Sequence, residues 1–253
     1  EKTVARFSNV VCAHRLKATY KFLASSTFSM LFIVGIGTSP SQLTLEALQA
    51  LRSCQKAYLE DYTSQYSSGS VQETEKLIGK SFVPLGRAQV EEGFSPVLDE
   101  AKLHDICLAI IGSPLDATTH IQIVLDAKDK GIGAKVIPGI GIFDLVSLCG
   151  LERYKFGRTT SIVFHEDGFE PESFYDVIVE NKKLGLHTLC LLDIKKGENR
   201  LMGISHALSI LESIEERREK NVLAESVMVC IAGIGSSGGQ IKAGTLEQLK
   251  MCN

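Results

Sequence analysis

The amino-acid sequence predicts an α/β protein with two layered units. Short apolar runs typical of buried strands alternate with segments in which apolar residues recur at helical spacing. The alternation begins at Leu31 and starts again near Ser161, after a stretch without a clear strand. Because this alternation is typical of helices packed on a mostly parallel sheet, each half is expected to form one α/β unit.

In the first unit, strands are expected where apolar residues are continuous. They are expected at residues 31–34, 57–59, 106–111 and 135–137. The run 106–111 is apolar throughout, which favours a strand buried on both faces. A helix is expected to follow Thr44, whose side chain can cap a helix start, and a second helix spans 119–130 and closes at Gly131.

The second unit repeats the pattern in shorter elements. Strands are expected at 161–164, 187–192 and 227–231, the last being the final clear strand. Pro171 opens one helix, and a longer helix runs from about residue 204 to 220. The junction between units is expected near residues 149–158. In chain order, the sequence is expected to form an N-terminal extension at 1–29, a first domain at 30–150 and a second domain at 151–253.

Composition narrows the classes of function. The 253 residues are 44% hydrophobic, which is ample for a buried core, and the net charge of −3 argues against broad nucleic-acid binding. A small ligand or a protein partner is therefore expected. No apolar run approaches the roughly 18 residues of a membrane span. The seven cysteines include no C-x-x-C pair, so they are interpreted as reduced core residues and neither a disulfide frame nor a zinc site is expected.

The segment 1–29 differs in composition from the rest of the chain. It carries five basic residues against one acidic residue, with serine and threonine throughout. This composition is typical of an organelle transit peptide. The alternative is an upstream extension preceding a start at Met30. Both interpretations place the segment outside the folded units.

A glycine pair in the first turn raises a dinucleotide-binding alternative. Gly35 and Gly37 follow the first strand and precede a helix, as in the G-x-G-x-x-G fingerprint. The third glycine is missing, because Pro40 stands at its position. A nicotinamide-dependent oxidoreductase is therefore disfavoured.

Several segments together resemble one family. They read L-F-I-V-G-I-G from Leu31, L-E-D-Y-T-S from Leu59, A-T-T-H from Ala117, L-E-R-Y-K-F-G-R-T-T-S-I-V-F from Leu151 and L-G-L-H-T-L-C-L-L-D-I-K-K from Leu184. The sequence thus resembles the diphthine synthase family of the tetrapyrrole-methylase superfamily, and the likeness covers nearly all of residues 31–250. The resemblance implies two α/β/α domains with a cofactor cleft between them.

The resemblance also implies the activity. Its members are S-adenosylmethionine-dependent methyltransferases of diphthamide biosynthesis, which release S-adenosylhomocysteine and methylate a modified histidine of translation elongation factor 2. The product is diphthine or its methyl ester. A cytoplasmic homodimer is implied, with no direct contact to nucleic acid or membrane. A small-molecule tetrapyrrole methylase is an alternative that keeps the fold.

Loops at the carboxyl ends of the strands are the expected ligand site, because open α/β sheets bind ligands there. With the resemblance, the predicted cofactor-binding residues are Thr38, Ser113, Asp116, Gly141, Ile142, Leu192 and Cys230. Gly141 is expected to approach the ligand by its backbone. No metal site is predicted. No catalytic base is assigned, since residues placed like His120, His187, Asp193 and Tyr62 more often have a structural role than a catalytic one.

Three positions depart from the family pattern. The family usually has Gly-Asp-Pro followed by Gly where this chain has Ser113 at the second position and Asp116 at the last, and it has Ser where this chain has Gly141. These departures favour a third alternative, a non-catalytic paralogue that retains the fold as a binding module. Family members also continue past the position of Asn253 with a strand that helps close the donor site, so 151–253 is expected to be a truncated domain.

Overall fold

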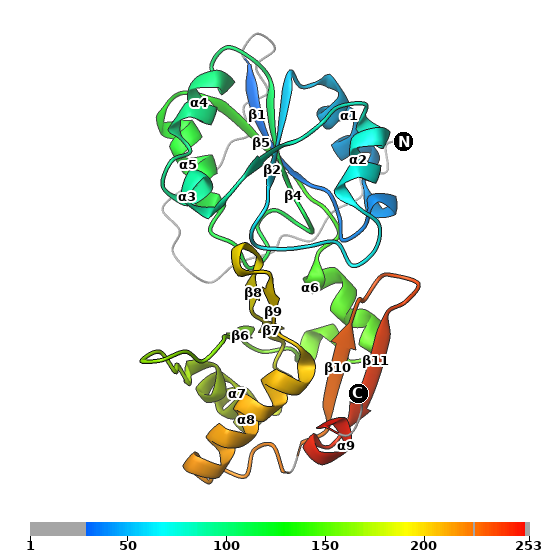
Figure 1. Cartoon of the computed structure of the whole chain (residues 1–253), viewed down its shortest axis with the longest axis vertical. Helices are drawn as coiled ribbons and strands as arrows, with labels where there is room; N and C mark the ends of the chain where they lie inside the picture. The colour runs from blue at the N-terminus through cyan, green and yellow to red at the C-terminus, as the bar shows by residue number, and fades with distance from the viewer. Residues whose placement is uncertain (1–28, 225, 251–253) are drawn as a thin grey trace, which may run out of the picture.

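The computed structural model describes residues 29–224 and 226–250. Almost all of the predicted extension at 1–29 therefore lies outside the described residues. Figure 1 shows a molecule in two parts along its long axis, with a twisted sheet flanked by helices in one part and smaller sheets with two long helices in the other. The fold is mixed α/β, as predicted. The division into domains at residue 150 stays a prediction.

The first part contains one parallel sheet of five strands in the order β3-β2-β4-β1-β5. Its elements are β1 (Met30–Gly35), the 3-10 turn η1 (Pro40–Gln42), α1 (Leu45–Ser53), β2 (Lys56–Glu60), α2 (Val71–Ile78), β3 (Val83–Leu85), α3 (Arg87–Glu91), α4 (Ser95–Ala101), β4 (Ile106–Ile110), α5 (Ile121–Asp129) and β5 (Gly133–Ile137). Strand β1 lies between β4 and β5, so that Leu31 pairs with Ile106 on one side and Ala134 on the other.

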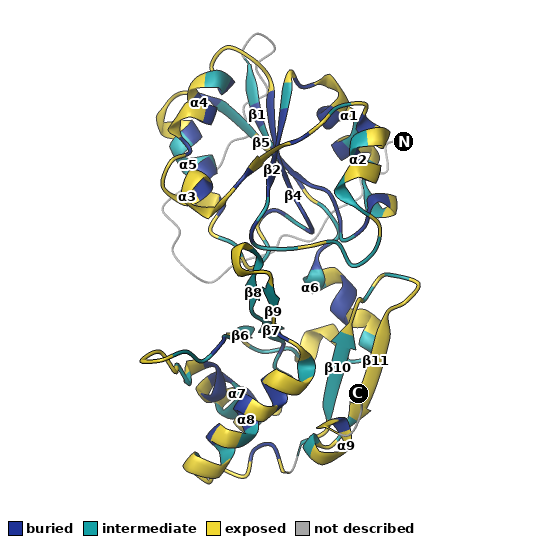
Figure 2. Ribbon diagram, in the orientation of Figure 1, coloured by how far each residue is buried: buried dark blue, intermediate teal, exposed yellow. Residues whose placement is uncertain are grey.

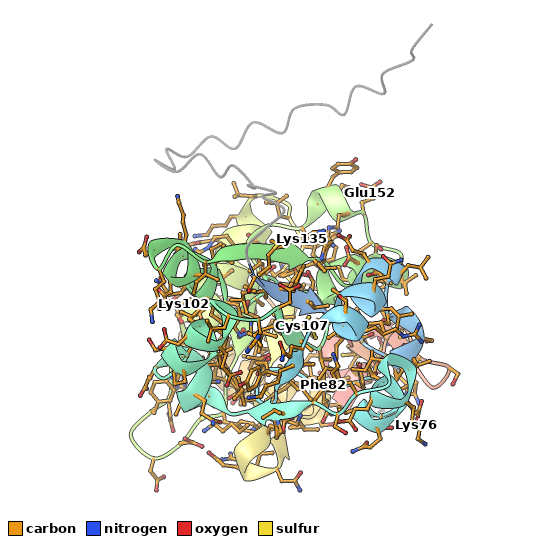
Figure 3. All side chains as sticks on the ribbon, turned by 90° about the horizontal axis from the view of Figure 1, so that it is seen from above. Lys76, Phe82, Lys102, Cys107, Lys135 and Glu152 are labelled. Carbon is orange, nitrogen blue, oxygen red and sulfur yellow. The ribbon has the colours of Figure 1, made fainter. Side chains whose placement is uncertain are left out.

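Alternate residues of the strands build two apolar layers. Leu31 and Ile33 of β1 pack in a cluster with helices α3, α4 and α5, whereas Val34 packs in a cluster with α1 and α2 on the opposite face. Figure 2 shows the central strands β1, β2 and β4 mostly dark blue and the outer helix faces yellow. In the view from above, Cys107 of β4 lies near the middle of the projection, while Lys76 and Lys102 lie near its margin (Figure 3). The central strands are therefore buried on both faces, as their continuous apolar runs predict.

Thr44 caps α1, as the sequence predicts. Its hydroxyl oxygen accepts a hydrogen bond from the backbone nitrogen of Ala47 at 3.1 Å. Thr44→Ala is expected to lower the free energy of unfolding by about 1 kcal/mol, because one amide at the helix start loses its acceptor. Urea unfolding measures the change. Thr44→Ser keeps the hydroxyl and should stay within a few tenths of the unaltered protein; equal losses in both variants would contradict the capping role.

The second part contains three two-stranded sheets, β6-β7, β8-β9 and β10-β11. Its elements are α6 (Ile142–Leu145), η2 (Val146–Cys149), η3 (Arg153–Lys155), β6 (Thr160–Ile162), α7 (Ser173–Lys183), β7 (Cys190–Leu192), β8 (Ile194–Lys195), η4 (Lys196–Glu198), β9 (Arg200–Leu201), α8 (Ile204–Arg218), β10 (Met228–Ala232), β11 (Gln240–Gly244) and α9 (Leu246–Lys250). A third apolar cluster joins β6 to α7 and α8 through Ile162, Phe174 and Leu211.

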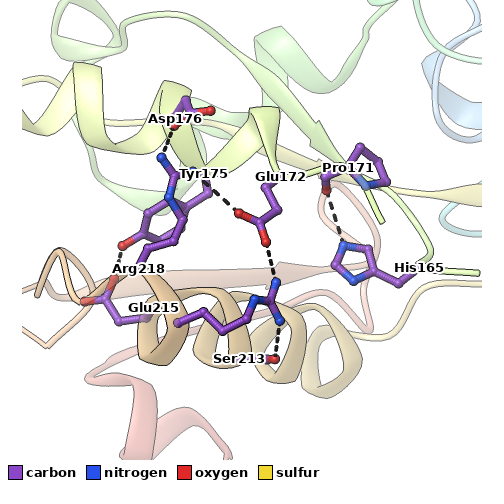
Figure 4. Close-up of polar contacts among 9 residues, drawn as sticks. His165, Pro171, Glu172, Tyr175, Asp176, Ser213, Glu215 and Arg218 are labelled. Carbon is purple, nitrogen blue, oxygen red and sulfur yellow. Dashed lines mark hydrogen bonds and ion pairs between the residues drawn. The ribbon is translucent and has the colours of Figure 1, made fainter. Parts of the chain in front are cut away.

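A polar network ties α7 to α8 (Figure 4). The Tyr175 hydroxyl donates to Glu215, whose other carboxylate oxygen accepts from the Leu223 nitrogen at 2.9 Å. Burial, followed by the neighbouring Glu215, raises the pKa of Tyr175, so the phenol stays protonated and able to donate. Arg218 pairs with Asp176 at 2.5 Å. The two helices are thus joined by polar contacts as well as by their apolar faces.

Several element boundaries differ from those predicted. The strand expected at 187–192 is shorter, because His187 forms only an isolated bridge with Phe156. The strand expected at 161–164 ends at Ile162. The backbone nitrogen of Phe164 donates to the Asp193 side chain at 3.1 Å and not to the neighbouring strand. The prediction that 227–231 is the final strand is wrong: β11 follows β10 and pairs with it antiparallel.

Candidate functional site

Three glycine-containing loops cross at the carboxyl ends of β1, β4 and β5. Gly37 and Gly112 exchange two backbone hydrogen bonds, at 3.2 and 2.8 Å between nitrogen and oxygen. A Cβ atom on Gly35 would lie 2.7 Å from the oxygen of Gly112, and one on Gly139 would lie 2.7 Å from the carbonyl carbon of Gly35. The loops therefore pack backbone against backbone, and no side chain fits between them.

Gly141 lies at the same crossing, but the atoms that leave no room for a side chain there are of a different kind. Its φ of −109° and ψ of −179° are extended values that any residue adopts. A Cβ atom there would lie 2.5 Å from Oδ2 of Asp116 and 3.0 Å from Cβ of Ser113. The glycine thus leaves space for a neighbouring protein side chain, whereas the sequence suggested that it leaves space for a ligand.

The Asp116 carboxylate lies in an unfavourable electrostatic setting. Burial, reinforced by the negative charge of Asp144, raises the pKa of Asp116, while Arg153 and the Ser113 hydroxyl act in the opposite direction. Asp144 itself accepts a hydrogen bond from the Gly141 nitrogen at 2.9 Å and so caps α6. Two carboxylates therefore face the loop that carries Gly141.

The raised pKa predicts a stability effect. The ionised Asp116 side chain is less stable in the folded chain than in the unfolded one, so Asp116→Asn is expected to raise the melting temperature at neutral pH. This advantage over the unaltered protein should shrink as the pH falls through the raised pKa, because Asp116 then takes up a proton in the folded state. Thermal unfolding across acidic and neutral pH measures it; a pH-independent difference would contradict the assignment.

Thr38 is held at the edge of the crossing. Its backbone nitrogen and hydroxyl both donate to Oε1 of Gln42 at 2.9 Å, and its carbonyl oxygen accepts from the Ser67 nitrogen at 2.8 Å. The other atom of the Gln42 amide, Nε2, lies 3.0 Å from where a Cβ of Gly235 would stand. The loop after β10 therefore packs against the turn that holds Thr38.

A second link joins the two parts through a short hairpin. The Lys196 ammonium, in the turn between β8 and β9, forms an ion pair with Asp61, in the loop after β2. Figure 1 shows this hairpin reaching towards the carboxyl ends of the parallel strands. Both side chains keep partial exposure, so the pair lies at the protein surface.

A mostly apolar cavity of about 610 Å³ lies beside the crossing, within the second part. It is bordered by β7, β10 and α8, and Ile142, Leu192 and Cys230 contribute to its wall. Volumes of about 300–1,000 Å³ are typical of small-molecule pockets. Burial raises the pKa of Cys190 to about 12, so this thiol on the same wall stays protonated.

The predicted site residues fall into two adjoining groups. Ser113, Asp116 and Gly141 contact one another, and the bridge from Gly37 to Gly112 sets the Thr38 turn beside them. Ile142, Leu192 and Cys230 line the cavity. Because Gly141 and Ile142 are consecutive, the loop crossing and the cavity meet at the start of α6.

Sequence reasoning missed some residues of the site. Asp144 and Gln42 anchor Gly141 and Thr38, and neither was predicted. The position of Asp144, third in the helix that follows Gly141, is a recognisable helix-start signal. Gln42 has no comparable signal, since its role depends on a loop that is distant in sequence.

The histidines near the site make structural contacts. Nδ1 of His120 lies 3.1 Å from the Pro114 carbonyl oxygen, and this contact supports the loop that carries Ser113 and Asp116. The backbone nitrogen of His187 donates to the backbone oxygen of Lys155 at 2.7 Å. Across residues 29–224 and 226–250, no group of three or more His, Cys, Asp or Glu side chains is arranged to hold a metal ion. Within the same ranges, no helix has the length and apolar content to cross a membrane.

Known proteins match this chain over most of its length. A sequence model of the family described as Tetrapyrrole (Corrin/Porphyrin) Methylases matches residues 30–250. The diphthine methyl ester synthase of Saccharomyces cerevisiae is 38% identical over 237 residues, covering 87% of this chain and 79% of the relative. The diphthine synthase of Methanococcus aeolicus is 37% identical over 222 residues, covering 87% of this chain and 86% of the relative.

A solved structure agrees. A crystal structure of a diphthine synthase superposes with a TM-score of 0.79 at 32% identity, covering 89% of this chain and 85% of that one. The family model and this superposition thus place the chain among methylases of the tetrapyrrole class. Within that class, the chain belongs to the diphthine synthase family.

Proposed function

We propose that the protein is an S-adenosylmethionine-dependent methyltransferase of diphthamide biosynthesis. The observation that carries the proposal is the similarity to diphthine synthases, which extends over 87% of the chain. The loop crossing and the cavity wall both lie within residues 30–250, which the tetrapyrrole-methylase family model matches. The resemblance noted from the sequence points to the same activity. The paralogue and tetrapyrrole-methylase alternatives lack a comparable observation in their favour.

The residues present fit the methyl donor. The apolar wall formed by Ile142, Leu192 and Cys230 suits the adenosyl moiety, and the cavity volume is sufficient. Ser113 and Asp116 lie next to Gly141, which directly precedes Ile142 of the cavity wall, and we propose that they supply the polar groups that such a ligand needs for orientation. S-Adenosylmethionine supplies an activated methyl group on a sulfonium, so the protein's contribution is alignment and exclusion of water.

We propose translation elongation factor 2 as the protein substrate, methylated on its modified histidine to diphthine or the methyl ester. The test is incubation of the purified protein with S-adenosylmethionine and elongation factor 2 carrying the unmethylated precursor, followed by mass spectrometry of the modified peptide. Three added methyl groups identify diphthine, and four identify the ester. An unchanged peptide mass, with a diphthine synthase relative active in parallel, would reject the proposal.

The cavity assignment makes its own prediction. Leu192→Asp places a carboxylate in the apolar wall, so affinity for S-adenosylhomocysteine is expected to fall about 100-fold, because an unpaired charge is costly to bury. Isothermal calorimetry measures the affinity. Leu201→Asp alters a leucine of β9 that is 49% exposed and serves as the matched control, with binding unchanged. Equal affinity in both variants would remove Leu192 from the donor site.

Further parts of the proposal concern organisation and location. The chain is proposed to form a cytoplasmic homodimer, with residues 30–150 and 151–253 as its two domains and without direct contact to nucleic acid. Sedimentation at micromolar concentration tests the assembly, and a mass of one chain would contradict it. Cell fractionation tests the location, and recovery in an organelle fraction would contradict a cytoplasmic site.

A further inference from the structure

Two thiols lie close together where helix α1 ends against strand β4. Cys54 is the residue at which α1 ends, and Cys107 is the second residue of β4. The Cys54 backbone nitrogen and the Cys107 Sγ both donate to the Ala50 backbone oxygen, at 3.0 and 3.5 Å. Both cysteines are free and belong to the apolar cluster between the sheet and helices α1 and α2. The fold thus brings together two thiols that are distant in the sequence.

A lysine side chain reaches the same place from the loop after α2. Nζ of Lys80 lies 3.5 Å from Sγ of Cys54. The same ammonium group donates to the backbone oxygens of Leu51, at 3.1 Å, and of Cys54. These oxygens belong to the end of α1, where the helix dipole favours a cation. The positive charge is therefore held beside the Cys54 sulfur by contacts that do not involve the sulfur itself.

The two sulfur atoms differ in how readily they ionise. The Cys107 thiol, by hydrogen bonding, lowers the pKa of Cys54, and the charge of Lys80 acts in the same direction against burial. The Cys54 sulfur, followed by burial, raises the pKa of Cys107. Because the thiolate is the nucleophilic form of cysteine, Cys54 is the reactive member and Cys107 stays a thiol beside it.

We propose that Cys54 and Cys107 form a reversible redox pair, in which Cys54 reacts with a peroxide, Cys107 closes a disulfide with it, and Lys80 keeps Cys54 reactive. A low-pKa cysteine next to a second cysteine that resolves it is the usual arrangement of a redox-sensing pair. Disulfides that form in reducing compartments are mostly of this transient kind.

The reaction balances with hydrogen peroxide as the oxidant. The Cys54 thiolate attacks one peroxide oxygen: an S–O bond forms, the O–O bond breaks, and the leaving hydroxide takes up the proton that Cys54 had released. Sγ of Cys107 then attacks the Cys54 sulfur, so that an S–S bond forms and the S–O bond breaks. The second hydroxide leaves with the Cys107 proton as water. Two electrons pass from the thiols to the peroxide, and a thiol reductant reverses the change by exchange.

Burial and position set the limits of this chemistry. Cys54 is 3% exposed and Cys107 is 0% exposed, so only an oxidant nearly as small as water, such as hydrogen peroxide, can reach them. Cys107 is near the amino end of β4, whereas the loop crossing lies beyond the carboxyl end of that strand. Neither cysteine lines the cavity. The redox pair is therefore independent of the proposed methyl transfer.

The test treats the reduced full chain with hydrogen peroxide at neutral pH. The remaining thiols are then alkylated after unfolding, and the chain is digested without reductant for mass spectrometry. The expected result is one linked pair of peptides, containing Cys54 and Cys107, that is lighter by two hydrogen atoms and separates with dithiothreitol. Cys190, whose pKa is raised by burial, should stay alkylated. If Cys54 and Cys107 both remained thiols after the part-exposed Cys149 had been oxidised, the proposal would be overturned.

Substitutions separate the roles of the three residues. Cys107→Ala should abolish the linked peptides and leave Cys54 heavier by one or more oxygen atoms. Lys80→Met should slow the oxidation of Cys54 about tenfold, because less of it is thiolate, and Lys80→Arg, which keeps a cation, is the matched control that should recover most of the rate. Melting temperatures confirm that each variant is folded. A disulfide from Cys54 to another cysteine in Cys107→Ala, at the rate of the unaltered protein, would overturn the pairing, and equal rates in both Lys80 variants would overturn the role of the cation.

Discussion

Gly139→Ala is expected to lower the free energy of unfolding by about 3 kcal/mol or more, at or above the upper end of typical overpacking effects. A Cβ at this position would lie 2.7 Å from the carbonyl carbon of Gly35 and even closer to the Gly112 oxygen. Both neighbours are backbone atoms, one at the end of β1 and one in the loop that follows β4, so neither can rotate away. The crossing of the three loops must separate to admit one methyl group. Denaturant unfolding measures the loss.

A matched control separates this clash from the general effect of removing a glycine. Gly197 lies in the turn between β8 and β9, has nothing within 4 Å of where its Cβ would stand, and needs no left-handed backbone. Gly197→Ala should therefore leave the free energy of unfolding within about 0.5 kcal/mol of the unaltered protein, as surface substitutions usually do. A Gly139→Ala protein as stable as this control would show that the loops do not pack as described.

Glu60→Ala is expected to cost about 3 kcal/mol of stability. The Glu60 side chain is 1% exposed at the end of β2, and its Oε1 accepts from the backbone nitrogens of Tyr62 and Thr63, both at 2.8 Å. The hydroxyl of Thr63 donates to Oε2. Alanine leaves these donors without their acceptor, and each unsatisfied buried group costs about 1–3 kcal/mol. Chemical unfolding provides the measurement.

Glu60→Gln is the informative companion to this variant. Glutamine keeps one acceptor oxygen for the two backbone nitrogens and replaces only the oxygen that faces the Thr63 hydroxyl, which can turn to accept instead. A loss of about 1 kcal/mol is expected, since charge-assisted hydrogen bonds become neutral ones. If glutamine were as damaging as alanine, the negative charge of Glu60, and not its hydrogen bonds, would hold the loop.

The central strands could be predicted because their physical signal is local. Residues 106–110 are apolar without interruption, and burial on both faces of a parallel sheet requires that pattern. Thr44 stands directly before an amphipathic segment, which is the pattern of a capped helix. In both cases the residues that decide the structure are adjacent in sequence, so no knowledge of tertiary contacts is needed.

The missed elements lack such a signal. Strand β3 has three residues and contains Pro84, which is typical of an edge strand, and β11 is largely exposed, so neither shows apolar alternation. Helix α2 was recoverable, because Ser70 and Glu73 form the pattern of a capping box. These elements depend on pairing or on short polar motifs that apolar periodicity does not detect.

The proximity of three loops could be predicted for the same reason. Strand ends could be located from the sequence, so the loops at Thr38, Ser113 and Gly141 were predicted as neighbours, and the structure places them together. The reason for glycine at position 141 could not be predicted, because it depends on where Asp116 directs its carboxylate. Distances between loops of different strands are a property of the folded chain.

The ion pair that joins the two parts is much easier to break than the backbone packing of the loop crossing. The ion pair of Lys196 with Asp61 is partly exposed, and such pairs contribute about 0–1 kcal/mol. The crossing at Gly35, Gly112 and Gly139, in contrast, cannot yield without distorting backbone. The crossing is therefore the rigid contact between these loops, and the hairpin that carries Lys196 is held to the first part by a contact that is energetically cheap to break. The position of this hairpin against the loop after β2 should then depend on ionic strength through the ion pair of Lys196 with Asp61, while the geometry of the crossing stays the same.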